Sequence, residues 1–260
     1  MEIVDSEKWW QDQELWLQHR VQDMIWVREA IPSLGNLTYR FSSGYAFILG
    51  TGPSIREVKD SEWAALSSYF TVGINQFSRW FQEDRRSTNI PALNFFVDER
   101  RDTEDDPNGS DKINEAFKRS MGRTLCGYSA WRYHHDWLVP VHGGDPQWDI
   151  EFGLFFTPMF RMNFNRCAIA AIHLCALLGY SNICLLGIDH GQSYKDGADV
   201  EIANRGYSLM NAWLGQRNVQ LIQCGAHSAV NTLRYIPLRR ALKDAAKYAN
   251  DETLKNLTVE

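Results

Sequence analysis

Short, continuous apolar runs recur along the chain, and each one ends at a glycine or a polar residue. Three of them, at 45–49, 70–74 and 92–97, lie in the first hundred residues, and two more cover 183–186 and 219–222. Runs of this length without polar alternation are typical of strands buried on both faces of a parallel sheet. We therefore expect five parallel strands in one sheet.

Segments with helical spacing lie between these runs. The stretch 165–178 is apolar on nearly all sides and is followed by Gly179 as a C-terminal cap, so it is expected to be a buried helix. Further helices are expected at 62–69, 201–216 and 238–248. Strands that alternate with helices predict an α/β fold, with a doubly wound, mostly parallel, Rossmann-like sheet as a single domain over 41–260.

Two segments fall outside this alternation. At residues 6–30, Trp10, Leu17, Val21 and Met24 share one helical face, which predicts an N-terminal helical extension over 1–40. Residues 99–162 begin with a charged, turn-rich run and continue through histidines and aromatic residues without a clear period. We expect this stretch to be a large insertion that serves as a lid or an acceptor-binding segment.

Composition narrows the class of protein. The chain has 260 residues, 44% hydrophobic and 23% charged, and a net charge of -5, so it lacks the bulk basicity of a protein that coats nucleic acid. No run reaches the roughly 20 apolar residues of a membrane span, and the N-terminus is acidic. We expect a soluble cytoplasmic protein. The five cysteines form no close pairs and are expected to be buried free thiols.

The ends of the predicted strands carry the candidate chemistry. Ligands of open parallel sheets bind beyond the carboxyl ends of the strands. There the sequence has Gly50 to Ser54, Asn75, Asp98, Gly187 to His190, and Gly225 to Ser228. The run "FILGTGPSI" ends the first strand and is either a ligand loop or a tight turn. It has neither the lysine of a Walker loop nor the third glycine of the dinucleotide fingerprint.

Acid–base chemistry has one main candidate at these ends. Asp189 beside His190 places a carboxylate next to an imidazole, a pair that suits a general base near neutral pH. Asn75 and Asp98 are suited either to bonding a ribose or sugar hydroxyl or to capping the next turn. His173, inside the apolar helix, is expected to be a core residue. No spacing typical of a metal site is present, so no bound metal is expected.

Three pieces of the sequence, "FILGTGPSI", "GINQF" and "NRCAIAAIHLCALLGYSNICLLGID", together resemble a known family. They are similar to the bacterial sialyltransferases that use CMP-sialic acid, and to the related flagellin glycosyltransferases and 6-hydroxymethylpterin diphosphokinases. The resemblance covers 46 to about 100 and 163–190, with a fainter match at 219–238. After Asp189 the long lid of the sialyltransferases, which bears their catalytic histidine, is replaced by a short polar loop.

The resemblance implies roles for particular residues. The turn formed by Gly50, Thr51, Gly52, Pro53 and Ser54 would hold the nucleotide phosphates, with Asn75, Asp98 and Gly187 nearby. Cys167 stands where the sialyltransferases carry a serine near the donor. Because the family's lid is missing, the base would be His190 or a residue of 99–162, with Asp189 and Asp98 as further catalytic candidates, and sialic acid is not the expected donor.

The function expected from sequence is that of a metal-independent glycosyltransferase. It would move a sugar from a UDP- or CMP-linked donor to a soluble hydroxyl acceptor, such as a saccharide, a protein or a hydroxymethylated DNA base. A DNA acceptor would need a basic rim, and the same cations could equally form a solvated face: Arg100, Arg101, Lys112, Lys118, Arg119 and Arg123. Two alternatives remain open, an ATP- and Mg²⁺-dependent diphosphotransferase acting on a pterin-like alcohol and a nucleotide-binding module without catalysis. The sequence leaves the oligomeric state open.

Overall fold

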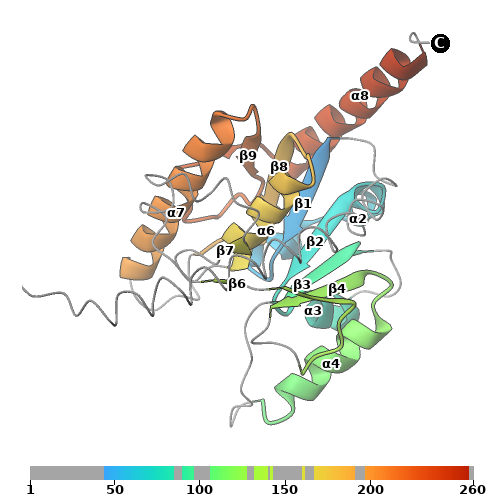
Figure 1. Ribbon diagram of the computed structural model, residues 1–260, viewed down its shortest axis with the longest axis vertical. Coiled ribbons are helices and arrows are strands. Elements are labelled where there is room, and N and C mark those ends of the chain that lie inside the picture. The colour runs from blue at the N-terminus through green and yellow to red at the C-terminus, as the bar shows by residue number, and fades with distance from the viewer. Residues whose placement is uncertain are drawn as a thin grey trace, which may run out of the picture.

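The main feature of the computed structural model is one eight-stranded parallel sheet with helices on both faces (Figure 1). The strand order is β10-β9-β8-β1-β2-β3-β4-β5. The structure describes residues 44–84, 90–96, 106–127, 132–139, 141–142, 160–161, 167–190 and 197–257. The predicted N-terminal extension, 1–40, lies outside the described residues.

The five predicted strands are all present in this sheet. They are β1 (Tyr45–Leu49), β2 (Phe70–Ile74), β3 (Leu93–Phe96), β8 (Asn182–Leu186) and β9 (Gln220–Gln223). The first four are buried along their whole length, as their unbroken apolar runs indicate. The doubly wound α/β fold expected from sequence is therefore confirmed.

Helices cover both faces of the sheet, and each face presents a different set of side chains from the same strands. On one face, α6 (Cys167–Leu177) and α7 (Gly197–Gly215) pack against residues such as Ile48 and Val72. The other face, lined by residues such as Phe47 and Leu49, is covered by α2 (Asp60–Leu66), α3 (Phe77–Asp84) and α8 (Leu238–Leu257). Because successive residues of a strand point to opposite faces, an unbroken apolar run supplies both layers of the core.

The helix α6 shows why its sequence is apolar all round. It contacts β1, β2, β3 and β8 of the sheet and also α7 and β7, so almost every position is buried. His173 is 1% exposed within this helix, which confirms it as a core residue. Gly179 has φ +88°, and the Tyr180 amide donates to the Cys175 carbonyl at 3.1 Å, so the helix ends in the predicted glycine cap.

Part of the segment 99–162 continues the sheet, which the sequence did not lead us to expect. It contains α4 (Gly109–Arg119), β4 (Arg123–Gly127) and β5 (Trp137–Val139), and β4 pairs in parallel with both β3 and β5. Ile113 and Phe117 of α4 pack with Phe96 in a small third cluster. In the sequence this apolar stripe is hard to recognise, because charged residues surround it in α4. A lid or acceptor-binding role for the rest of the segment stays a prediction.

The remaining elements are short. The 3-10 helix η1 (Pro53–Glu57) follows β1, and β10 (Arg234–Tyr235) lies at the β9 edge of the sheet. A separate two-stranded pair consists of β6 (Val141–His142) and β7 (Phe160–Arg161). All five cysteines are buried free thiols, as expected, and burial raises the pKa of Cys126 to about 12. Among the described helices, none combines the length and apolarity needed to cross a membrane.

Candidate functional site

The sheet changes its direction of growth between β1 and β8. From β1 the chain adds β2, β3, β4 and β5 on one side, whereas β8, β9 and β10 are added on the other. Leu49 is in register with Leu186 of β8 and with Gly73 of β2, so the loops after these strands leave from the same edge. This is the topological switch point, where open α/β sheets bind their ligands.

The glycine turn after β1 lies directly against the end of β8. The Gly50 amide donates to the Leu186 carbonyl at 2.8 Å, and the Gly52 amide donates to the Gly187 carbonyl at 2.7 Å. A Cβ on Gly50 would lie 2.4 Å from the Gly187 carbonyl oxygen, and Gly187 itself has φ +67°. These glycines therefore have a structural reason: they allow two strand ends to approach each other closely.

A buried carboxylate fastens the turn to the loop after β8. One oxygen of Asp189 accepts from the Ser54 amide and the other from the Ser54 hydroxyl, both at 2.7 Å. The Ser54 hydroxyl in turn accepts from the Gly187 amide at 3.2 Å. Asp189 is 3% exposed. Cβ atoms on Gly52 or Gly225 would both lie 2.6 Å from its oxygens, so glycines line this site as well.

These bonds change which part of the turn is free for a ligand. In a phosphate-binding turn followed by a helix, the amides of Ser54 and Ile55 would face the phosphate. Here the first donates to Asp189 and the second to the Gly52 carbonyl at 3.2 Å, so an internal carboxylate occupies the anion position. Pro53 has no N–H. Thr51 is exposed, and among the described residues its amide and hydroxyl have no protein partner.

His190 is held by a residue that the sequence did not single out. Its backbone is left-handed, with φ +47°, and its Nε2 lies 2.9 Å from the hydroxyl of Tyr207 on α7. Tyr207 is fully buried. The carboxylate of Asp189 bonds to Ser54 rather than to His190, so the two adjacent side chains serve different contacts. His190 itself is half-buried at the edge of the sheet.

The loop after β9 is fixed to the same place. The Ser228 hydroxyl donates to the Ile188 carbonyl at 3.1 Å, and the Ala229 amide donates to the Asp189 carbonyl at 2.7 Å. Asn204 of α7 donates to the Ala229 carbonyl at 3.0 Å. The loops after β1, β8 and β9 thus form one connected unit, as their positions at the ends of neighbouring strands predicted.

The other predicted site residues are less closely joined. Asn75, after β2, is exposed with φ +53°, and its amide donates to the Phe95 carbonyl at 3.1 Å. Cys167 begins α6, where its buried Sγ lies 3.8 Å from that same carbonyl. Both residues therefore lie at the carboxyl edge near the end of β3. Asp98 lies outside the described residues, and its predicted role stays a prediction.

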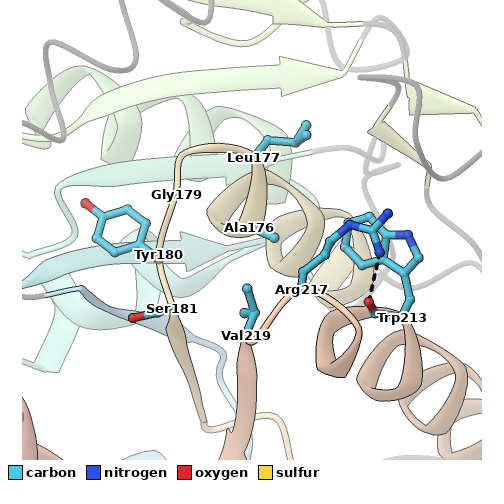
Figure 2. Close-up of a pocket in the computed structure, with 8 residues that line it drawn as sticks. All are labelled: Ala176, Leu177, Gly179, Tyr180, Ser181, Trp213, Arg217 and Val219. Atoms are coloured by element: carbon cyan, nitrogen blue, oxygen red, sulfur yellow. Dashed lines mark hydrogen bonds between the residues drawn. The ribbon is translucent and has the colours of Figure 1, made fainter.

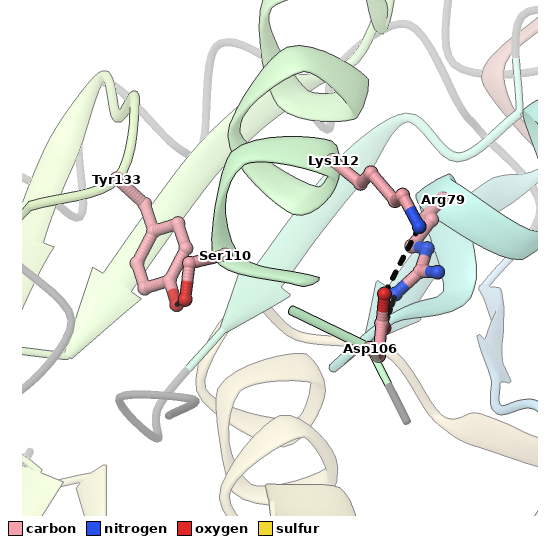
Figure 3. Close-up of polar contacts among 5 residues, drawn as sticks. All are labelled: Arg79, Asp106, Ser110, Lys112 and Tyr133. Atoms are coloured by element: carbon pink, nitrogen blue, oxygen red, sulfur yellow. Dashed lines mark hydrogen bonds and ion pairs between the residues drawn. The ribbon is translucent and has the colours of Figure 1, made fainter. Parts of the chain in front are cut away.

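A second carboxylate organises the β3 side of this edge (Figure 3). Asp106, just before α4, is bound by Arg79 of α3 at 2.5 Å and by Lys112 of α4 at 3.0 Å. Hydrogen bonds from these two cations hold its pKa at about 2. Nearby, the hydroxyls of Tyr133 and Ser110 lie 3.4 Å apart.

The described cations proposed for a basic rim all have carboxylate partners. Lys112 binds Asp106, whereas Lys118 and Arg119 both reach Glu115, at 2.9 and 3.8 Å. Arg123 binds Asp136 at 2.7 Å. These pairs have the arrangement of a solvated mixed-charge face. Two further candidates, Arg100 and Arg101, lie outside the described residues.

A cavity lies at the opposite end of the sheet (Figure 2). Its volume is about 420 Å³, and its lining includes Tyr180 and Ser181, just before β8, and Val219, just before β9. The Arg217 guanidinium stacks 4.1 Å from the centre of the Trp213 ring and donates to the Trp213 carbonyl. Burial lowers the pKa of Arg217. The cavity is therefore remote from the loops at the carboxyl edge.

No metal-binding cluster of three or more histidine, cysteine, aspartate or glutamate side chains occurs within the ranges that the structure describes. The sequence did not predict that Tyr207 contacts His190, or that Gly225 leaves room for the contact between Ser54 and Asp189. Tyr207 lies 17 residues from His190, and Ser54 lies 135 residues from Asp189. No local pattern marks such pairs.

No protein-family model matches the sequence, and no curated protein matches it. Among solved structures, the chain is similar to the MAf glycosyltransferase from Magnetospirillum magneticum AMB-1, with a TM-score of 0.50 and 12% sequence identity. The match covers 80% of this chain and 37% of that protein, so the chain spans little more than a third of it. At this identity the likeness concerns the fold, which it places beside that of a glycosyltransferase.

Proposed function

We propose that this protein is a glycosyltransferase that transfers a sugar from a nucleotide-linked donor to a hydroxyl acceptor. The observation that carries the proposal is the position of the Thr51 turn at the switch point between β1 and β8. The fold likeness to the MAf glycosyltransferase supports it independently of the sequence motifs. A UDP- or CMP-linked sugar is the proposed donor.

Thr51 is the proposed phosphate contact of the turn. Its amide and hydroxyl are the donors left after the other amides of Gly50 to Ile55 have bonded within the protein or, at Pro53, are missing. A donor phosphate that accepts from both would be held on the outer side of the turn. In this position the contact would stabilise the charge that develops on the departing phosphate.

His190 is the proposed general base. It follows β8 at the same edge, and the bond to Tyr207 gives its ring a defined orientation. In this role Nδ1, since Nε2 contacts Tyr207, takes the proton from the acceptor hydroxyl as the hydroxyl oxygen bonds to the anomeric carbon of the sugar. The bond from that carbon to the donor phosphate breaks, and the nucleotide leaves with the electron pair. Nδ1 is buried, so the proton transfer requires that the ring be uncovered when the acceptor binds.

A metal-dependent diphosphotransferase is the competing function. It would need carboxylates free to bind Mg²⁺ beside the phosphates. Asp189 lies at this edge but is not such a carboxylate, because both of its oxygens accept hydrogen bonds from Ser54 inside the protein. We therefore favour metal-independent transfer, in which positioned protein donors bind the phosphate.

A thermal-shift screen separates these functions. The full chain is heated with UDP-, CMP- and GDP-linked sugars and with ATP, each with and without Mg²⁺. Stabilisation by a nucleotide sugar without Mg²⁺ is the expected result, because a ligand that binds only the folded state raises its stability. Stabilisation by ATP with Mg²⁺ alone would contradict the proposal. Binding of a nucleotide sugar without any hydrolysis or transfer would favour a non-catalytic module.

A further inference from the structure

The Asp189 carboxylate lies beyond the end of β8 but is turned inward, where it bonds to Ser54. Asp189 is 3% exposed, and both of its partners come from the glycine turn, one as a backbone amide and one as a hydroxyl. We define the Ser54–Asp189 pair, together with Gly225, as the clasp. The space around the pair is so small that a methyl group on Gly225 would lie 2.5 Å from the Ser54 hydroxyl and 2.6 Å from Asp189.

The clasp lies between two candidate ligand contacts. Ser54 is three residues after Thr51 in the same turn, and Asp189 directly precedes His190. The backbone of Asp189 is also held, because its carbonyl accepts from the Ala229 amide at 2.7 Å. A shift of the Ser54–Asp189 bonds would therefore move the donor turn relative to the loop that carries the proposed base.

We propose that Ser54, Asp189 and Gly225 are positioning residues that set the shape of the donor turn before any nucleotide binds. Asp189 supplies an internal anion in place of a ligand phosphate, so that Thr51 is left facing outward. The inference rests on the proposed function, because it assumes that the turn receives a nucleotide. It assigns Asp189 to donor binding and removes it from proton transfer.

Three variants of the full chain test the clasp. Ser54→Ala removes the hydroxyl but keeps the amide bond to Asp189, whereas Gly225→Ala pushes the two side chains apart without removing a polar group. Gly215→Ala is the matched control, since a Cβ there meets no atom within 4 Å. Hydrogen exchange of the segment around Gly50 to Ile55 is measured without ligand, and the affinities for CMP and UDP are measured by calorimetry.

The proposal expects faster exchange of this segment in Ser54→Ala and Gly225→Ala, with nucleotide affinity at least about tenfold lower than in the wild type. With an active donor and acceptor, KM for the donor should rise by a similar factor while kcat changes less than about threefold, because the lost contact acts on binding. Gly215→Ala should match the wild type in all three measurements. Ser54→Ala keeps the test valid if Gly225→Ala does not fold.

The possible failures are distinguishable. Faster exchange with unchanged nucleotide affinity would show that the clasp is structural only and would overturn the positioning role alone. A fall in kcat at constant KM would also overturn it, since that result is expected of a residue acting in the chemical step. If the wild type bound neither CMP nor UDP and no UDP-, CMP- or GDP-linked sugar stabilised it in the thermal-shift screen, the proposed function would be overturned and the positioning role with it, whatever the exchange rates.

Discussion

Asp189 and Asp106 each join segments that meet at the carboxyl edge of the sheet, two loops at Asp189 and the helices α3 and α4 at Asp106, but they do so in opposite ways. Asp189 is 3% exposed and accepts from an uncharged amide and hydroxyl, in a space lined by glycines. Asp106 is 14% exposed and is bound by two cations on long side chains. The first contact depends on backbone geometry, whereas the second depends on charge that solvent and salt can screen.

The buried contacts of Asp189 therefore hold the candidate site in shape, whereas the ion pairs of Asp106 contribute less to its structure. A buried hydrogen bond that is broken leaves its partners without water to replace it, so the cost is large. A broken ion pair that is partly exposed, as at Asp106, lets both groups regain some water, so the cost is smaller. We therefore expect the β1–β8 side of the edge to be rigid and sensitive to single-atom changes, and the α3–α4 side to tolerate them.

The pair of substitutions Asp189→Asn and Asp106→Asn should give the largest contrast. An amide in place of Asp189 keeps one acceptor oxygen and turns an NH₂ group toward Ser54, so the free energy of unfolding should fall by about 2–3 kcal/mol. Asp106→Asn should cause a much smaller fall. Urea unfolding followed by tryptophan fluorescence measures the free energy of unfolding of both variants. Equal losses would contradict the expected difference between the two carboxylates.

Gly50→Ala tests whether the buried side depends on close backbone approach. The added Cβ would lie 2.4 Å from the Gly187 carbonyl oxygen and 3.1 Å from the Gly187 carbonyl carbon, and these backbone atoms cannot move aside as the end of a flexible side chain could. Overpacking of this kind should lower the free energy of unfolding by about 1–3 kcal/mol. Gly215→Ala serves as the control in the same urea experiment. A Gly50→Ala protein as stable as its control would show that the two strand ends can separate without cost.

Tyr207→Phe removes one neutral hydrogen bond on the buried side and leaves the ring in place. The loss of the bond to His190 Nε2 should lower the free energy of unfolding by about 1 kcal/mol. The loss in turnover, expressed as an activation free energy, should exceed the loss in the free energy of unfolding, because the His190 ring is no longer held in one orientation. Steady-state rates at two donor concentrations, set beside a urea curve, check this. Unchanged turnover would remove Tyr207, and with it the proposed orientation of His190, from the mechanism.

The Asp106 cluster should respond to pH and salt. Its pKa of about 2 in the folded state lies below the ordinary value of 3.8, so its contribution to stability is present above pH 3.8 and is lost as the pH falls toward 2. High salt should weaken the same contribution at neutral pH. Urea curves of wild type and Asp106→Asn at pH 6 and pH 2, in low and high salt, should nearly converge under the acidic condition. If the stability difference between wild type and Asp106→Asn did not change with pH or with salt, the ion pairs of Asp106 would not be its source.

The sequence predicted the strands from β9 to β3 better than the β4–β5 edge of the sheet. Apolar runs such as 45–49 and 183–186 are buried on both faces, so their pattern is unbroken and easily recognised. By contrast, β4 contains Arg123 and Thr124, and α4 shows only the stripe of Ile113 and Phe117 among charges. These elements are stabilised by contacts with β3 that no local pattern records.

The candidate site shows the same limit. Strand-end residues such as Thr51 and His190 could be placed at one edge because parallel strands share a direction. Their partners could not be predicted, since Ser54 meets Asp189, and His190 meets Tyr207, only after the sheet has formed. The glycines of the turn fitted a phosphate loop and a tight turn equally well. The structure shows that Gly50 and Gly52 also serve packing against β8.

The most direct test of the proposed nucleotide site compares the affinity for CMP and UDP, by titration calorimetry, in the wild type, Thr51→Val and Arg217→Ala. Thr51 lies at the switch-point edge, and Arg217 lines the cavity at the other end of the sheet. Loss of the Thr51 hydroxyl should weaken binding about tenfold, whereas Arg217→Ala should bind like the wild type. Unchanged affinity in Thr51→Val together with lost affinity in Arg217→Ala would place the nucleotide at the wrong end of the sheet and contradict the account.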